Sequence, residues 1–228
     1  MSDAVAADFR AEPWWWEAAP RDHSPPPPLP ARADVAIVGS GYAGLAAAVT
    51  LARAGRHVVV LDAGAPGSAA SSRSVGMVGG RLRQSPGALT AALGAEAATA
   101  LMREANAAYG WFRDFVRDEG ILCDLVRTGR LVCAWTARDL DRLRGLSRLL
   151  GERVGIESHV VDRAGLAREI ATDLFHGALV LPGDGGVHPA RLHDGLLQAA
   201  RKAGAVVIPF TRVDGIDETA AGVELSSA

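Results

Sequence analysis

The segment VAIVGSGYAGLAAAV, residues 35–49, limits the fold of this 228-residue chain more strongly than any other stretch. It begins as a short apolar run rich in β-branched residues, passes through three closely spaced glycines and continues as an alanine-rich run of helical composition. A second apolar run, VVVLD, then ends at Asp62. This order predicts a strand, a tight turn, a helix and a second parallel strand, which together form the βαβ unit of an α/β fold.

Gly39, Gly41 and Gly44 occupy the three glycine positions of the pattern G-x-G-x-x-G. The first glycine allows the tight turn, the second lets the backbone approach a pyrophosphate, and the third lets the helix pack closely on its strand. The free N–H groups of a helix beginning near Tyr42 would face the phosphates. Asp62 would accept hydrogen bonds from the adenosine ribose hydroxyls, and its charge would repel a 2′-phosphate, which disfavours NADP. The pattern therefore predicts a site for the ADP half of a dinucleotide.

FAD and NAD carry the same ADP half, so the glycine pattern does not distinguish them. The sequence of the loop after Asp62 is the evidence that can. Residues 67–80, GSAASSRSVGMVGG, are rich in small residues and contain one fixed cation, Arg73, with a serine on each side. Such a loop suits wrapping around the long pyrophosphate and ribityl chain of FAD. An NAD-dependent dehydrogenase would be expected to continue with another regular helix and strand, and it remains the alternative.

Composition excludes several other classes of function. The 24 Lys and Arg residues nearly balance the 26 Asp and Glu residues, so no broad basic field is available for nucleic acid. Cys123 and Cys133 have apolar neighbours and no metal-ligand spacing, and we expect both to be buried thiols and no metal to be bound. There is no Ser-His-Asp arrangement and no Walker lysine. Without an apolar run of about 18 residues or an N-terminal leader, we expect no membrane span and a cytoplasmic location.

The first 31 residues differ in composition from the rest. They contain the triplet Trp14, Trp15 and Trp16 and a run of prolines from Pro25 to Pro28. A proline run is an extended polyproline II segment that cannot join a helix or a central strand. It could serve as a ligand for a groove in a partner domain, but we expect a stiff tail whose three tryptophans pack on the body of the protein, because exposed tryptophans would form a costly apolar patch.

The rest of the chain alternates between helical and strand patterns. A long helical region is expected to break near Gly94 and Gly110, and Thr136 is expected to cap a helix ahead of Asp139. The remaining expected elements, in chain order, are a helical region at 88–120, a strand within 125–135, a helix at 136–150, a short helix within 161–170, a strand and tight turn within 176–189, a helix at 189–204, and a strand followed by a hairpin within 205–228.

Residues 33–76, ADVAIVGSGYAGLAAAVTLARAGRHVVVLDAGAPGSAASSRSVG, resemble the opening of the FAD-dependent glycine/D-amino-acid oxidase (DAO) family. The similarity is strongest to the γ-glutamylputrescine oxidase-like branch, which also tends to begin with a tail containing Trp and Pro. The family's second motif, G-A-S-G-R-N-G-G, is matched at Ala70, Ser71, Arg73 and Gly76. Residues that depart from it are Ser72, Ser74 and Val75. Residues 129–143 are similar to a strand and helix of the family's substrate domain, and residues 177–216 to the segment that returns to the FAD domain.

The resemblance implies an α/β architecture, a Rossmann-type FAD-binding domain with an inserted α+β substrate domain. Family members continue for about as many residues again, so both domains are expected to be incomplete and the chain to be an N-terminal half. The expected segments are a tail at 1–31, an FAD-binding domain at 32–82 and 186–228, and part of a substrate domain at 83–185. Val213 corresponds to a residue that bonds the adenine through its backbone. The full set expected to contact the cofactor is Gly39, Ser40, Gly41, Tyr42, Ala43, Gly44, Asp62, Ala63, Ser71, Ser72, Arg73 and Val213.

The resemblance also implies a reaction. A flavoenzyme of this family oxidises the C–N bond of an amine or amino acid by hydride transfer to the flavin. No catalytic residue can be assigned, although His188, Arg81 and Arg83 are candidates. We expect His188 to fix a turn before Pro189, and one arginine could pair with a substrate carboxylate. Because the missing strands would leave unpaired sheet edges, the isolated chain is expected to aggregate or to hold FAD weakly. A further alternative is an FAD-binding half that works only with a separate C-terminal chain.

Overall fold

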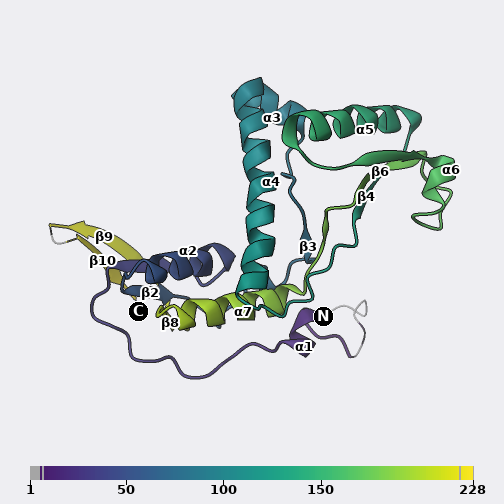
Figure 1. Cartoon of the computed structure of the whole chain (residues 1–228). Coiled ribbons are helices and arrows are strands. Elements are labelled where there is room, and N and C mark those ends of the chain that lie inside the picture. The colour runs from purple at the N-terminus through teal and green to yellow at the C-terminus, as the bar shows by residue number, and fades with distance from the viewer. Residues whose placement is uncertain (1–5, 7, 221, 228) are drawn as a thin grey trace. The chain divides into compact units, whose positions relative to one another are not determined.

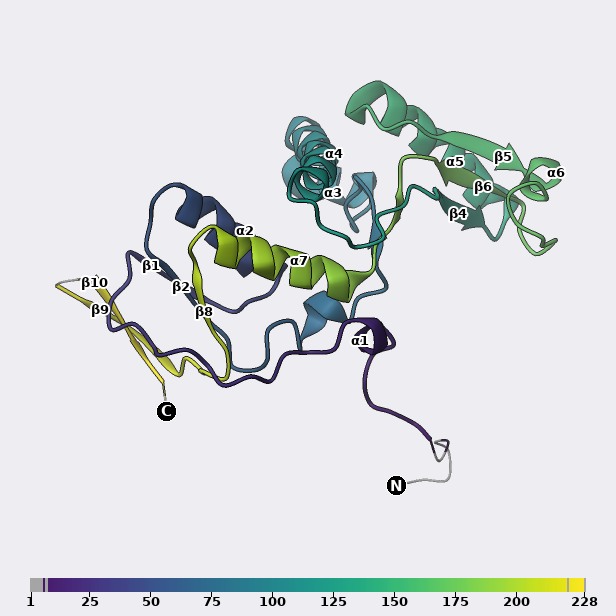
Figure 2. The same ribbon diagram turned by 60° about the horizontal axis from the view of Figure 1, so that its bottom comes forward.

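Three apolar runs form one parallel sheet in the computed structural model, which describes residue 6, residues 8–220 and residues 222–227 (Figure 1). The strands are β1 (Val35–Val38), β2 (Val58–Leu61) and β8 (Val206–Ile208), in the order β1-β2-β8. Figure 2 shows helices α2 (Tyr42–Arg53) and α7 (Pro189–Lys202) side by side over this sheet. The four residues of β2 are all buried, as expected for the central strand of a covered parallel sheet. The predicted βαβ unit is confirmed.

The chain divides into two compact units. The first contains the described residues up to Val75, the short segment Ile121–Cys123 and the described residues from His188 onward. The second contains Gly76–Gly120 and Asp124–Val187. The functional domains expected from the sequence stay a prediction.

Strand β1 has a partner on only one edge among the described residues. It pairs with β2 on one edge, and no described strand pairs with its other edge. The side chain of Val38 is 56% exposed, and Ala36 is exposed as well. An open edge of this kind presents unpaired backbone N–H and C=O groups to any other strand.

This open edge leads to a prediction about association. Because a lysine on an edge strand blocks strand-to-strand pairing, we expect the purified chain to self-associate as its concentration rises and Val38→Lys to reduce that association. Sedimentation velocity over a concentration series measures it. The control Val75→Lys adds the same charge at a residue that is 73% exposed in a loop. If the two variants behave alike, the edge of β1 is not the associating surface.

The first unit also contains the ends of the described chain. Its remaining elements are helix α1 (Trp15–Ala18), a short 3₁₀ turn (Ala70–Ser72), and the antiparallel hairpin of β9 (Gly215–Thr219) and β10 (Gly222–Ser226). The hairpin was predicted, and Pro25–Pro28 are exposed and outside any helix or strand.

The prediction for the three tryptophans is wrong in one respect. Trp15 and Trp16 are partly buried, but Trp14 is 75% exposed. The reason is geometric, because successive residues of a helical turn point about 100° apart and three in a row cannot all face one surface.

An antiparallel sheet organises the second unit. Strand β6 (Gly177–Leu181) lies between β4 (Arg130–Ala134) and β5 (His159–Asp162). The other elements are α3 (Pro86–Leu93), α4 (Ala95–Asp118), α5 (Ala137–Leu149), a single π-helical turn (Leu150–Val154), α6 (Arg163–Leu166), and the short antiparallel pair of β3 (Met77–Val78) and β7 (Gly185–Gly186). One apolar cluster in the core of this unit contains Leu89, Ala98, Met102, Leu150, Val154, Leu179 and Leu181.

Local signals for helix ends are confirmed in part. Gly94 separates α3 from α4 with φ +81°, a value that favours glycine, whereas α4 continues without a break through Gly110. An isolated glycine costs a helix only about 1 kcal/mol, which the packing of a 24-residue amphipathic helix can offset. The cap at Thr136 is confirmed, because its hydroxyl accepts from the N–H of Asp139 at 3.1 Å and the Asp139 carboxylate accepts from the N–H of Thr136.

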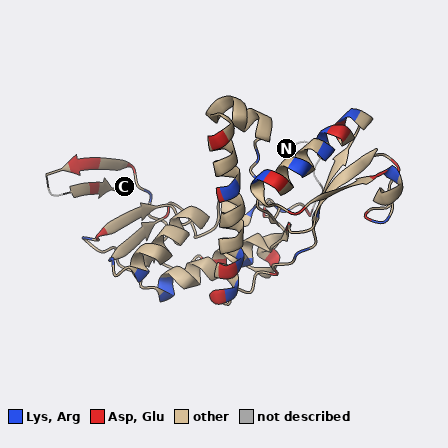
Figure 3. Cartoon of the chain, turned by 45° about the horizontal axis from the view of Figure 1, so that its top comes forward, with Lys and Arg blue, Asp and Glu red and all other residues tan. Residues whose placement is uncertain are grey.

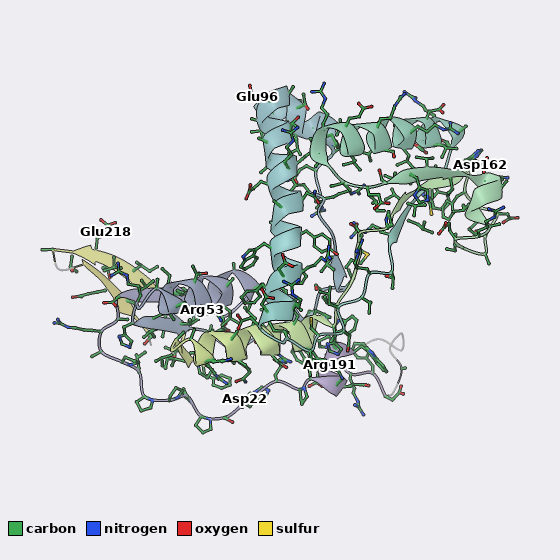
Figure 4. The ribbon with its side chains drawn as sticks, in the orientation of Figure 1. Asp22, Arg53, Glu96, Asp162, Arg191 and Glu218 are labelled. Carbon is green, nitrogen blue, oxygen red and sulfur yellow. The ribbon has the colours of Figure 1, made fainter. Side chains whose placement is uncertain are left out.

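The short helix expected within 161–170 is only four residues long. Asp162 ends β5 and also caps α6, since its carboxylate accepts from the N–H of Gly165 at 2.8 Å (Figure 4). The first two residues of the segment, Val161 and Asp162, pair with β6 as part of β5 and therefore do not join the helix.

Charges of both signs lie close together along α4 and α5 (Figure 3). On α5 they form i,i+3 pairs such as Arg144 with Asp141 at 2.6 Å. Neither cysteine forms a disulfide within the described residues. Cys123 is buried and Cys133 is partly buried, and burial raises the pKa of the Cys133 thiol. Of the helices in the described part of the chain, none is long and apolar enough to cross a membrane.

Candidate functional site

The glycine turn joins the end of β1 to the beginning of α2. Gly39 has φ +97° and donates its N–H to the carbonyl of Leu61 at 2.7 Å, which ties the turn to β2. A Cβ atom built on Gly44 would overlap the carbonyl oxygen of Gly39 and lie 3.2 Å from the side chain of Ile37. Only glycine lets the first turn of α2 approach this closely. Gly39 and Gly44 thus have the backbone positions that their sequence pattern predicts.

The first N–H groups of α2 point away from the helix and need partners. Gly41 is the N-cap residue, with extended backbone angles (φ −71°, ψ 179°), and no side chain caps it. The Ser71 hydroxyl accepts from the N–H of Tyr42 at 3.2 Å, and a Cβ on Gly41 would lie 3.1 Å from that hydroxyl. Ala43 follows in the first turn. A helix beginning with free N–H groups favours an anion at this end.

The Asp62 carboxylate holds the turn and the next loop together. One oxygen accepts from both the N–H and the hydroxyl of Ser40, at 2.7 and 2.6 Å, and the other accepts from the N–H of Gly64 at 2.9 Å. Ala63 follows and is exposed. The oxygen bonded to Gly64 retains a second lone pair. The expected contact of Asp62 with a ribose stays a prediction.

The other expected loop residues differ in their surroundings. Ser71 faces the start of α2, whereas Ser72 is fully buried and its hydroxyl bonds within the protein. Arg73 is exposed, and its Nε donates to the carbonyl of Ser68 at 2.8 Å. Val213 lies between β8 and β9 and packs on the apolar cluster of Val59, Leu61 and Ile208. The structure therefore brings Ser71 to the glycine turn and leaves the Ser72 side chain facing the protein interior.

Two side chains attach α7 to the glycine turn: His193, which was missed in the sequence, and Tyr42, which was expected only as a cofactor contact. His193 is fully buried, and its Nε2 lies 2.8 Å from the carbonyl oxygen of Ser40. A carbonyl can only accept, so Nε2 carries the proton. The Tyr42 hydroxyl donates to the carbonyl of Pro189 at 2.8 Å, and burial raises the pKa of Tyr42. A histidine among the leucines of a helix's apolar face was the signal that could have identified His193.

The three candidate catalytic residues have different positions. His188 is the N-cap of α7, and its Nδ1 accepts from the N–H of Arg191 at 3.2 Å. It therefore fixes the first turn of the helix that begins at Pro189, and not a turn before Pro189 as expected. Arg83 is exposed.

Arg81 lies in the second unit and is partly buried. It borders a cavity of about 200 Å³ whose apolar lining includes Met102 and Leu146. Its Nε and Nη1 atoms are buried and have no hydrogen-bond acceptor among the described residues. Burial and the nearby Arg130 lower the pKa of Arg81, while burial raises the pKa of Asp184 beside it.

Comparison with known proteins decides the family. Residues 34–227 match the family described as FAD dependent oxidoreductase, or DAO, which is most of the chain. The chain belongs to the FAD dependent oxidoreductase family. The resemblance found in the sequence and the expected α/β FAD-binding fold are thereby confirmed.

Relatives within the FAD dependent oxidoreductase family include bacterial enzymes. The chain is 31% identical over 191 residues to the gamma-glutamylputrescine oxidoreductase of Escherichia coli strain K12, covering 83% of this chain and 44% of that protein. The crystal structure of glycine oxidase from Geobacillus kaustophilus has a TM-score of 0.69 and 29% identity, covering 86% of this chain and 51% of that one. L-Amino acid deaminase from Proteus myxofaciens, at 19% identity and a TM-score of 0.76, shares the fold over 92% of this chain and 45% of that one. The chain spans about half the length of the curated relatives it matches.

Proposed function

We propose that this chain binds FAD through its glycine turn and belongs to an enzyme that oxidises the C–N bond of an amine or amino acid. The observation that carries the proposal is the N-terminus of α2. At position 44 only glycine fits against the Gly39 carbonyl. The N-cap residue Gly41 has no side chain, so it cannot cap the first N–H groups of the helix. Family membership favours FAD over NAD for this site.

The residues present fit the ADP half of FAD. The N–H groups of Gly41, Ala43 and Gly44 would hold the pyrophosphate, while the Tyr42 N–H is bonded to Ser71. The positive end of the dipole of the 12-residue helix α2 would stabilise the negative charge of the pyrophosphate. Ser71, whose hydroxyl proton can still be donated, lies beside these N–H groups. Asp62 and Ala63 would lie at the ribose, and Val213 at the adenine. When bound, FAD accepts a hydride from the carbon next to the substrate nitrogen.

The remaining residues support this binding site or the substrate. His193 and Tyr42 hold α7 against the turn, so the turn is ordered before any ligand arrives. We assign residues 83–185 to the substrate side. We also assign Arg81, which immediately precedes this segment, as the group for a substrate carboxylate. The support for Arg81 is a partly buried guanidinium with two nitrogens that lack acceptors in the described chain. A guanidinium matches a carboxylate in charge and in planar geometry.

A second function is favoured by the open edge of β1. A strand from a separate C-terminal chain could pair there in parallel, and this chain would then be the FAD-binding half of a two-chain enzyme. Binding of FAD without oxidation of any amine by the chain alone is the result expected for this function. Turnover by the chain alone would contradict it.

Titration with FAD tests the proposed site, with Gly41→Asp as the variant. An aspartate at the N-cap position stabilises a helix by accepting from its first N–H groups, so it would fill the anion site while preserving the fold. We expect FAD affinity to fall by a factor on the order of 100, because two negative groups would compete for one helix end, while the unfolding midpoint is unchanged or higher. Flavin fluorescence measures the affinity, and circular dichroism the midpoint.

The matched control is Gly87→Asp, which places the same residue in the first turn of α3 at an exposed position with open space around it. It should bind FAD as the unmodified chain does. Equal affinity of the unmodified chain and Gly41→Asp would show that FAD does not use the glycine turn. Displacement of FAD by stoichiometric NAD would favour the dehydrogenase alternative.

A further inference from the structure

The N-terminal tail bonds to the loop that follows β2 through two indole N–H groups. Trp15 Nε1 donates to the carbonyl of Ser74 at 2.9 Å, and Trp16 Nε1 donates to the hydroxyl of Ser72 at 2.7 Å. The Ser72 hydroxyl is fully buried and in turn donates to the carbonyl of Gly67. The middle of the loop is therefore bonded to the tail on one side and to the start of the loop on the other.

The ring of Trp16 makes a second contact with the same loop. The guanidinium carbon of Arg73 lies 4.3 Å from the centre of this ring, a cation–π distance. Arg73 also bonds back to Ser68. One tryptophan thus contacts two successive loop residues, one through its N–H group and one through its face.

Arg21 anchors this part of the tail to α7. Its side chain is 2% exposed, and its two terminal nitrogens bond to the two carboxylate oxygens of Asp194 at 2.8 and 3.0 Å. One of them also donates to the carbonyl of Ala19 at 2.6 Å. Asp194 adjoins His193, whose ring bonds to the glycine turn at Ser40. Figure 2 shows α1 close to the beginning of α7.

The loop of residues 67–74 has little structure of its own to keep it in place. It contains only glycine, alanine, serine and Arg73, and its only regular element is one 3₁₀ turn. A loop of small residues loses much conformational freedom when it is ordered, and a ligand that must order it binds more weakly as a result.

We propose that residues 15–21, the N-terminal clamp, hold loop 67–74 in its cofactor-binding conformation, with Trp16 and Arg21 as positioning residues. Trp16 acts through Ser72, whose neighbour Ser71 bonds to the N–H of Tyr42 at the start of α2. This inference rests on the proposed function, because the ligand positioned by the loop is FAD.

The test uses Trp16→Phe, which keeps an aromatic ring but removes the indole N–H group together with one of the two fused rings, a loss of size that the control below shares. Trp14→Phe is the matched control two residues earlier, at a position that is 75% exposed. Two quantities are measured in the full chain: hydrogen exchange of the amides of residues 68–75 without FAD, and FAD affinity by flavin fluorescence. For Trp16→Phe we expect faster amide exchange and a loss of FAD affinity on the order of tenfold, because the buried Ser72 hydroxyl loses the N–H group that donates to it. For Trp14→Phe we expect no change in either quantity.

A double-mutant cycle with Ser72→Ala separates positioning from general destabilisation. If Trp16 acts through Ser72, Trp16→Phe should add little to the affinity loss that Ser72→Ala already causes. Additive losses, or equal exchange and affinity for Trp16→Phe and Trp14→Phe in a chain that binds FAD, would overturn the clamp. Absence of FAD binding by the unmodified chain, together with faster exchange in Trp16→Phe, would instead overturn the proposed function and leave a clamp that orders the loop.

Discussion

Gly44→Ala is expected to abolish detectable FAD binding and to lower the free energy of unfolding by roughly 1–3 kcal/mol. The added methyl group would overlap the carbonyl oxygen of Gly39, and it would also lie 3.2 Å from the Ile37 side chain. The oxygen belongs to the backbone of a turn that is bonded to β2, so it cannot rotate away as a side chain could. The first turn of α2 must therefore move away from β1, and the N–H groups that would hold the pyrophosphate move with it.

Chemical denaturation and a flavin titration measure the two effects. Gly145→Ala is the matched control, since Gly145 lies inside α5 and an added Cβ meets no atom within 4 Å. Alanine is the better helix former, so this control should be as stable as the unmodified chain or slightly more stable. Normal FAD binding by Gly44→Ala would show that the close approach of helix and turn is not required for the cofactor.

Asp62→Ala is expected to have the second largest effect on FAD binding. It removes the acceptor for the N–H and hydroxyl of Ser40 and for the N–H of Gly64. Hydrogen bonds to a charged group contribute about 1.5–3 kcal/mol each, and bonds that share one carboxylate are not additive, so a total loss of roughly 2–5 kcal/mol is expected. FAD affinity should fall by a factor on the order of 100, because the ribose acceptor is lost and the turn loosens at the same time.

Thermal unfolding and the same titration test this expectation. Asp141→Ala is the control, because Asp141 pairs with Arg144 on the exposed face of α5, where such pairs contribute little to stability. If Asp62→Ala unfolds at the same temperature as the control but loses FAD, the carboxylate serves the ligand alone. If it keeps FAD, the predicted ribose contact is wrong.

Features carried by neighbouring residues were predictable from the sequence. The glycine turn, the strands on either side and the end of α3 at Gly94 all follow from backbone preferences of a few adjacent residues. The cap at Thr136 follows from one hydroxyl and a carboxylate three residues later. The prediction of a break at Gly110 failed because the propensity of one residue is weaker than the packing of a long helix.

Features that join distant parts of the chain were not predictable in this way. His193 reaches a carbonyl 153 positions away, and Trp16 reaches Ser72 across 56 positions. The sequence around each of these residues contains no pattern that indicates which distant residue it contacts. Ser72 illustrates the consequence, since its place in a motif predicted a cofactor contact, whereas its hydroxyl bonds to Trp16 and Gly67.

The bond between Arg21 and Asp194 also sets a time order for assembly in the cell. The two residues are 173 positions apart, so at about 5–20 residues per second a ribosome makes Asp194 roughly 10–35 s after Arg21. Throughout that interval the tail and its tryptophans have no helix α7 to bind. The tail, although it is synthesised before α7, is therefore among the last segments to dock, and we expect a nascent chain to become competent to load its cofactor only after α7 has left the ribosome.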